Sequence, residues 1–255
     1  MLESHIRSRL NEKKILLMTH IVIGYPTLEA SMEIVRTMVE AGVDLMELQI
    51  PFSEPIADGP VILKANQQAL ANGTTVDQCL DFGRRVAGAF SIPFLYMTYY
   101  NILFKYGVDR FAEHMKTAGL QGAIVPDLPP EEADDYLAAM KKYSLAPIFI
   151  YSPTTSDPRM HTIAQVADGF VYCVARKGVT GDRTAFSRQI GDYLDRCRRA
   201  TSLPLALGFG VKDKTDVQFL RGKADVAVIG TQAMRVMEDQ GVGALRAFIH
   251  DLRHP

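Results

Sequence analysis

The sequence predicts a (β/α)8 barrel, the TIM-barrel fold of the α/β class. Short apolar runs rich in Val, Ile, Leu, Met and Phe alternate with longer amphipathic segments from one end of the chain to the other. This alternation is typical of a parallel sheet covered by helices. Eight such runs in 255 residues fit one closed barrel better than a doubly wound sheet. Because no linker, repeat or low-complexity tract divides the chain, we expect a single domain over residues 1–255.

The apolar runs define the expected strands. They span residues 15–23, 43–50, 92–98, 121–126, 145–150, 169–174, 203–208 and 224–230. Helical periodicity predicts helices at residues 28–41, 61–71, 76–89, 108–118, 131–143, 157–166, 185–199, 213–221 and 241–252. Gly42 follows the first of these helices, where a helix C-cap is expected.

Composition and charge exclude several classes of partner. Lys and Arg number 28 against 29 Asp and Glu, so the formal net charge is −1 and no basic footprint for nucleic acid is present. No run reaches the ~18 apolar residues of a membrane helix. The first residues lack the apolar core of a secretory signal, and we therefore expect a cytoplasmic protein.

Cofactor and metal motifs are also missing from the sequence. Cys79, Cys173 and Cys197 are widely spaced and form no CxxC pair, which argues against disulfides and structural zinc. His250 and His254 have the spacing of metal ligands, but they lie in the last residues, where chain ends usually fray. Without a P-loop or GxGxxG element, we expect neither a nucleotide cofactor nor a metal.

The second expected strand, residues 43–50, carries the first candidate catalytic residue, Glu47. Side chains alternate along a strand, so Glu47 shares a face with Leu45 and Gln49. If that face points into the barrel, the carboxyl lies in an apolar mouth. Desolvation raises the pKa of a carboxyl, which would suit a general acid or base near neutral pH. The alternative is an outward Glu47 bonded to a helix cap or paired with a Lys.

The loop that follows, residues 51–60, is long for a strand-to-helix turn, and its three prolines make it stiff. It contains two acids, Glu54 and Asp58. Asp58 and Glu47 flank one strand end and could act together on a bound ligand. The Asp58-Gly59-Pro60 sequence is also typical of a helix start, so Asp58 could instead be an N-cap.

Glycine-rich turns follow the last three expected strands. Gly208-Phe209-Gly210 follows the seventh strand and Gly230-Thr231 the eighth, where barrels commonly hold a phosphate on backbone N–H groups and a helix N-terminus. Residues 176–181 follow the sixth strand and could close over the same site as a lid. The alternative is that these glycines merely end strands.

Residues 46–60, MELQIPFSEPIADGP, resemble the signature of the tryptophan synthase α subunit family, whose usual form is E-L-G-x-P-F-S-D-P-x-A-D-G-P. Further segments of the chain match the family in order, so the resemblance covers essentially the whole sequence. These segments are residues 24–31, 101–107, 125–132, 175–181, 208–211 and 230–231.

The resemblance implies a (β/α)8 barrel that cleaves indole-3-glycerol phosphate to indole and glyceraldehyde 3-phosphate, a retro-aldol lyase reaction without a cofactor. Glu47 matches the family's proton-shuttling glutamate, and Asp58 matches the aspartate that binds the indole N–H. Tyr99 and Tyr172 match tyrosines that line the pocket. The substrate-binding set that the resemblance implies is completed by Thr180, Gly181, Gly210, Gly230 and Thr231, mainly as the phosphate cradle.

The resemblance also implies a partner, the tryptophan synthase β subunit. This pyridoxal-phosphate enzyme takes indole through a tunnel and condenses it with serine, in an α2β2 complex. Loops at residues 51–60, 101–105 and 126–131 would face it. Loop 51–60 and the lid at 176–183 would order over bound ligand and carry the allosteric coupling.

Three residues depart from the family pattern. Gln49 replaces a glycine and could crowd the indole pocket or hydrogen-bond Glu47. Glu54 replaces an aspartate of the partner-facing loop, and His20 lies where an apolar, often aromatic, residue is usual. Gln49 and Glu54 motivate an alternative, a catalytically weak α-like subunit that mainly binds and activates a β partner. A third possibility is another phosphosugar barrel enzyme, which would need a catalytic Lys or Asp pair on other strands.

Overall fold

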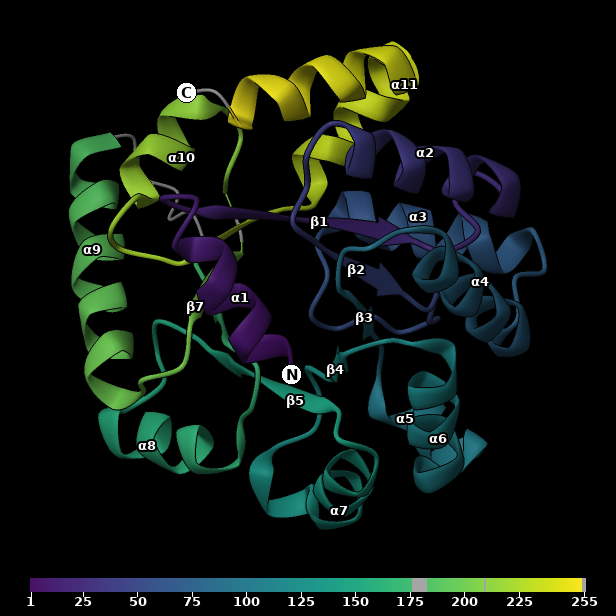
Figure 1. Cartoon of the computed structure of the whole chain (residues 1–255), viewed down its shortest axis with the longest axis horizontal. Coiled ribbons are helices and arrows are strands. Elements are labelled where there is room, and N and C mark those ends of the chain that lie inside the picture. The colour runs from purple at the N-terminus through teal and green to yellow at the C-terminus, as the bar shows by residue number, and fades with distance from the viewer. Residues whose placement is uncertain (176–182, 209, 254–255) are drawn as a thin grey trace.

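The computed structural model describes residues 1–175, 183–208 and 210–253. Eight parallel strands close into a barrel in chain order, and helices surround it (Figure 1). The predicted (β/α)8 fold and all eight predicted strands are confirmed. The strands are β1 (Leu16–Val22), β2 (Leu45–Gln49), β3 (Phe94–Met97), β4 (Gly122–Ile124), β5 (Ala146–Tyr151), β6 (Val171–Val174), β7 (Leu205–Gly208) and β8 (Val226–Ile229).

The predicted helices are also found, with shifted ends. They are α2 (Leu28–Glu40), α3 (Pro60–Ala71), α4 (Val76–Ala89), α6 (Val108–Ala118), α7 (Asp134–Tyr143), α8 (Asp157–Val166), α9 (Arg183–Ala200), α10 (Lys214–Leu220) and α11 (Thr231–Arg253). The segment predicted as residues 131–143 begins with a separate 3-10 turn, η1 (Pro130–Glu132), before α7. Only the second half of α11 was predicted, because Gly241 interrupts it with a φ of 82°.

Two helices have no counterpart in the sequence prediction: α1 (Leu2–Leu10) and α5 (Tyr100–Tyr106). Both are short, and α1 is mostly polar with only Leu2 and Ile6 buried, so helical periodicity is weak in both. Figure 1 shows α1 lying across the barrel opening. Because α1 precedes β1, the end that it covers is the N-terminal end of the strands.

Local signals in the sequence explain where the helices begin and end. The Thr27 side chain accepts a hydrogen bond from the Ala30 N–H at 3.1 Å and caps α2. Thr75 and Gln78 form a capping box at the start of α4. Gly42 has a φ of 96° just after the C-cap of α2, as predicted, since a left-handed backbone favours glycine.

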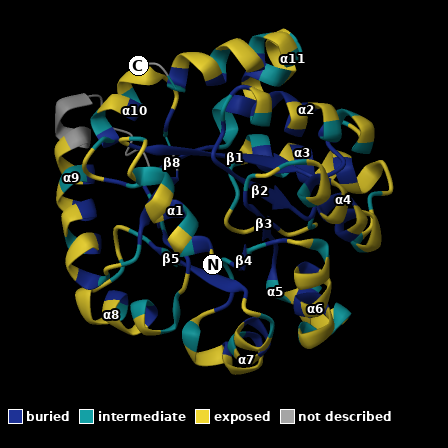
Figure 2. Ribbon diagram, viewed as in Figure 1, coloured by how far each residue is buried: buried dark blue, intermediate teal, exposed yellow. Residues whose placement is uncertain are grey.

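Apolar side chains fill two regions that the alternation of the strands separates. Outward-facing residues such as Leu17 and Leu48 pack under the helices, whereas inward-facing ones such as Leu16 and Leu45 fill the barrel together with Leu2 of α1. Figure 2 shows the strands buried and the helices exposed on their outer faces. With the N-terminal end closed by α1, polar groups are concentrated at the C-terminal end of the strands.

We predict that Gly122→Ala destabilises the barrel. Gly122 pairs with Ala146 across β4 and β5, and an added Cβ would lie 2.2 Å from the Ala146 carbonyl oxygen. This backbone clash should lower the free energy of unfolding by about 1–3 kcal/mol in urea denaturation. Gly88→Ala in α4 is the control, since no atom lies within 4 Å of its added Cβ. Equal stability of the two variants would contradict the prediction.

Candidate active site

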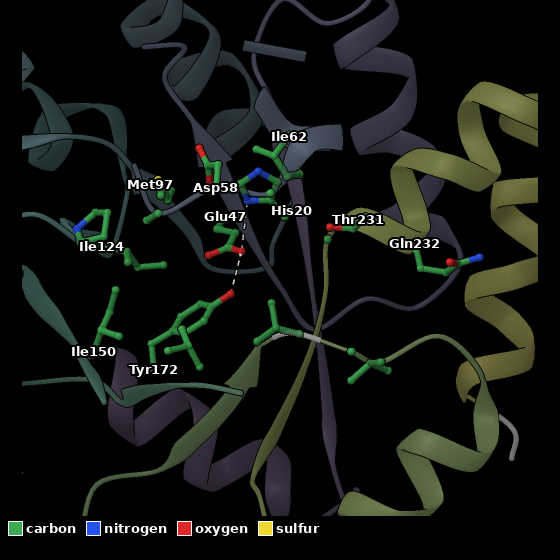
Figure 3. A pocket seen from close by; sticks show the side chains of 18 of the residues that line it. His20, Glu47, Asp58, Ile62, Met97, Ile124, Ile150, Tyr172, Thr231 and Gln232 are labelled. Atoms are coloured by element: carbon green, nitrogen blue, oxygen red, sulfur yellow. Dashed lines mark hydrogen bonds and ion pairs between the residues drawn. The ribbon is translucent and has the colours of Figure 1, made fainter. Parts of the chain in front are cut away.

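Glu47 lies on the inner face of β2, and its side chain points into the barrel mouth (Figure 3). It is 2% exposed. The strand register places His20 of β1 opposite it, and His20 Nδ1 lies 3.1 Å from Glu47 Oε1. The Tyr172 hydroxyl of β6 donates a hydrogen bond to the same oxygen at 3.3 Å. The alternative of an outward Glu47 bonded to a helix cap or a Lys therefore does not hold.

The groups around Glu47 have shifted pKa values. Burial lowers the pKa of the His20 imidazole, but the hydrogen bond and charge of Glu47, with the charge of Asp58, outweigh it and raise this pKa above its ordinary value. Burial and the nearby Glu47 carboxyl raise the pKa of Tyr172 well above its ordinary range. Tyr172 therefore stays protonated at neutral pH and can act as a hydrogen-bond donor.

Asp58 lies near Glu47 but has different partners. Gln49 Nε2 donates a hydrogen bond to Asp58 Oδ2 at 2.6 Å, and the Tyr99 hydroxyl donates to the same oxygen at 3.3 Å. Burial raises the pKa of Asp58, while the hydrogen bond from Gln49 and the charge of His20 oppose that shift. The N-cap interpretation of Asp58 is wrong, because the N-cap of α3 is Gly59, without a side-chain bond.

The loop between β2 and α3 is held from beneath by buried side chains. Asn66 of α3 accepts a hydrogen bond from the Phe52 N–H at 2.9 Å. The Tyr99 hydroxyl accepts one from the Ala57 N–H at 3.2 Å, and its ring stacks on Phe52 with 5.0 Å between centroids. Gln49 also reaches Asn66, at 3.4 Å. The Gln49 amide thus binds Asp58 and Asn66 and not Glu47, which was one of the two possibilities that the sequence left open.

A cavity of about 350 Å³ opens at the C-terminal end of the barrel. Figure 3 shows Glu47, Asp58 and His20 grouped together, with Thr231 at the start of α11 beside His20. The apolar part of the lining is Met97, Ile124, Ile150, Val174 and Val228. The part able to bind an anion is Gly210, Lys212, Gly230, Thr231, Gln232 and Arg235.

Most of the predicted site residues lie together. Those that line the cavity are Glu47, Asp58, Tyr172, Gly210, Gly230 and Thr231. Tyr99 does not line it but lies behind Asp58, only 1% exposed. Thr180 and Gly181, with most of the predicted lid 176–183, lie outside the described residues. Lys212 and Arg235 were missed, although Lys212 closely follows the Gly208–Gly210 turn.

Within residues 1–175, 183–208 and 210–253, no group of three His, Cys, Asp or Glu side chains could hold a metal ion. No helix in this part of the chain is long and apolar enough to cross a membrane. The closed barrel has a cavity lined by carboxyls and glycine turns. These features place the protein in the class of (β/α)8-barrel enzymes.

Comparison with known proteins identifies the family. The model of the family "Tryptophan synthase alpha chain" matches residues 6–250. The tryptophan synthase alpha chain of Syntrophotalea carbinolica is 70% identical over 253 residues, covering 99% of this chain and all of the relative. That of Desulforapulum autotrophicum is 62% identical over 252 residues, with the same shares covered. The chain therefore belongs to the tryptophan synthase alpha chain family, whose members are lyases that cleave indole-3-glycerol phosphate.

Solved structures agree with this assignment. Tryptophan synthase subunit alpha from Legionella pneumophila superposes with a TM-score of 0.90 at 30% identity, covering 99% of this chain and 97% of that one. Tryptophan synthase from Mycobacterium tuberculosis, in an aminoacrylate-bound form, gives a TM-score of 0.90 at 29% identity with the same shares covered.

Proposed function

We propose that this chain cleaves indole-3-glycerol phosphate to indole and glyceraldehyde 3-phosphate, with Glu47 and Asp58 as its catalytic acids. The observation that carries the proposal is that one cavity is lined by two carboxyls, those of the buried Glu47 and the part-buried Asp58, and by glycine turns and a helix N-terminus. Incubating the purified chain with the substrate and measuring indole tests it. Absence of indole without a β subunit, together with activation of an added one, would favour the weak α-like alternative.

The reaction needs two acids with different roles. Breaking the carbon–carbon bond requires a proton for indole C3, removal of a hydroxyl proton from the side chain, and stabilisation of positive charge on the ring nitrogen. Glu47 supplies the first proton and its carboxylate accepts the second, so it is restored after each turnover. Its Oε2 atom has no hydrogen-bond partner among the described residues and is available to the substrate. Asp58, when ionised, stabilises the ring nitrogen.

The remainder of the cavity suits the remainder of the substrate. Ile124 and Ile150 offer apolar surface to an indole ring. Gly230 and Thr231 lie at the N-terminus of α11, where backbone N–H groups and the helix dipole favour a phosphate. Arg235 lines the same cavity and adds positive charge.

Glu47→Gln should lower the rate of indole formation more than about 100-fold, because the amide cannot transfer protons. Its shape is nearly unchanged, so thermal unfolding should stay close to that of the wild type. Steady-state kinetics and a melting curve measure both. Glu113→Gln, an exposed substitution on α6, is the matched control and should leave both values unchanged. A Glu47→Gln variant with the wild-type rate would reject the assigned role.

Thr231→Asp should raise KM about 10-fold or more with a smaller effect on kcat. A carboxylate at this end of α11 repels the phosphate, yet it suits the first turn of a helix, so the fold should be retained. A 10-fold rise in KM corresponds to a loss of about 1.4 kcal/mol in the free energy of substrate binding. Thr231→Ser keeps a hydroxyl there and should keep KM. If both variants have the same KM, the phosphate does not bind at this helix.

We further propose that the chain works with a β subunit in an α2β2 complex, bound through residues 51–60, 101–105 and 126–131. The predicted loop at 101–105 is helical and lies within α5. Two large apolar side chains in these segments are exposed: Ile56 at 78% and Phe104 at 70%. Large exposed apolar side chains are typical of protein interfaces.

Phe104→Asp should weaken binding of a β subunit at least about 10-fold while leaving indole formation by the isolated chain unchanged. The physical reason is that a buried interfacial carboxylate without a partner is unfavourable. Calorimetric titration with a β subunit measures the affinity. Leu70→Asp, at the far end of α3 and 36% exposed, is the control and should bind normally. Equal affinities for the two variants would contradict the proposed surface.

A further inference from the structure

His20 is a polar side chain in a buried position, where an apolar side chain would cost less free energy to bury. It is 5% exposed, and its Cβ lies 3.4 Å from the position of a Cβ built on Gly230, so it is packed between β2 and β8. A buried imidazole is unfavourable unless its polar atoms are paired. The Nδ1 atom is paired with Glu47 at 3.1 Å, whereas Nε2 has no partner among the described residues.

The contact distinguishes the two oxygens of Glu47. Oε1 lies within hydrogen-bond distance of both His20 and the Tyr172 hydroxyl, so it is fixed from two sides by two strands. Oε2 is buried and has no partner in the described parts of the chain. A carboxylate held through one oxygen presents the other in a defined direction, which is the geometry that proton transfer to a bound ligand requires.

We propose that His20 is a positioning residue for Glu47, which anchors one carboxyl oxygen so that the other is directed toward the bound substrate. The inference rests on the proposed function, since it assigns His20 a role in the same reaction. His20 does not itself need to touch the substrate.

Charged and titratable groups around His20 come from three directions. Glu47 faces it from β2, Asp58 from the loop before α3, and Tyr172 lies beyond Glu47 on β6 (Figure 3). Just after β8 the neighbour is Gly230, which carries no charge. The basic residues of the cavity lining are Lys212 and Arg235. Glu47 and Asp58 together raise the pKa of His20, so the positive charge of the imidazole is lost as pH rises through that raised value.

Nuclear magnetic resonance of the histidine side chains tests the contact without any assay of activity. The chain has 6 histidines, and the signal that disappears in His20→Phe is that of His20. In the wild type it should titrate above the ordinary value of about 6.5. In Glu47→Gln it should titrate at least about one pH unit lower, because burial then dominates. A His20 signal that is unaffected by Glu47→Gln overturns the proposal.

The separate effects on kcat and KM test the positioning role. His20→Phe should lower kcat about 10-fold, because Glu47 Oε1 then keeps only the Tyr172 hydroxyl as a partner. KM should change less than about 3-fold, because substrate contacts remain. His20→Asn can donate a hydrogen bond close to the former Nδ1 position, so it should recover kcat, which a merely structural role of the imidazole would not predict.

Controls separate this proposal from the function on which it rests. His161→Asn, exposed on α8, should match the wild type in kcat and KM. A wild-type kcat for His20→Phe overturns the positioning role even if Glu47→Gln is inactive. If the wild type releases no indole, the proposed function fails and the positioning role fails with it, whereas the resonance titration still decides whether His20 and Glu47 form a pair. If His20→Phe does not fold, the resonance titration of Glu47→Gln and the kinetics of His20→Asn still test the proposal.

Discussion

A carboxyl group buried inside an apolar barrel has to be hydrogen-bonded or paired, and this constraint governs the mouth of the barrel. Glu47 shares the inner face of β2 with Leu45, so nothing on its own strand satisfies it. Its partners come from other strands, His20 on β1 and Tyr172 on β6. The contacts therefore depend on closure of the barrel and on the register of β1 against β2. Closure of the barrel therefore also brings the hydrogen-bond partners of Glu47 into place.

Asp58 meets the same constraint by another route. It belongs to a loop, which the barrel does not position directly, and its neighbours hold both the carboxyl and the backbone. Gln49 and Tyr99 donate to the carboxyl, while Tyr99 and Asn66 accept from backbone N–H groups of the same loop. β2 thus carries Glu47 and, two residues further on, the anchor of Asp58. The two acids keep a fixed spacing because one rigid strand supports both.

The sequence predicted what depends on periodicity and missed what depends on contacts between distant segments. Alternation along a single strand was enough to group Glu47 with Gln49 on one face. The partner of each side chain depends on register and on how the loop folds back, which no local pattern encodes. Gln49 was therefore expected beside Glu47 and instead binds Asp58, and the contact between His20 and Glu47 was not foreseen. The short helix α1 was missed because helical stability there comes from docking rather than from periodicity.

Two departures from the family pattern, His20 and Gln49, have the same explanation in the structure, since each is a hydrogen-bond partner of one acid. An apolar side chain and a glycine at these positions could make no side-chain hydrogen bond, which would leave Tyr172 as the hydrogen-bond donor to Glu47 and Tyr99 as the donor to Asp58. Each replacement adds one polar partner to one acid, on neighbouring strands of the same mouth. Loss of catalytic function would give no reason to retain either acid or to add a buried polar partner to each, since unpaired buried groups are unfavourable. The departures are therefore better explained as support for the two carboxyls than as a sign of a chain that only binds a partner.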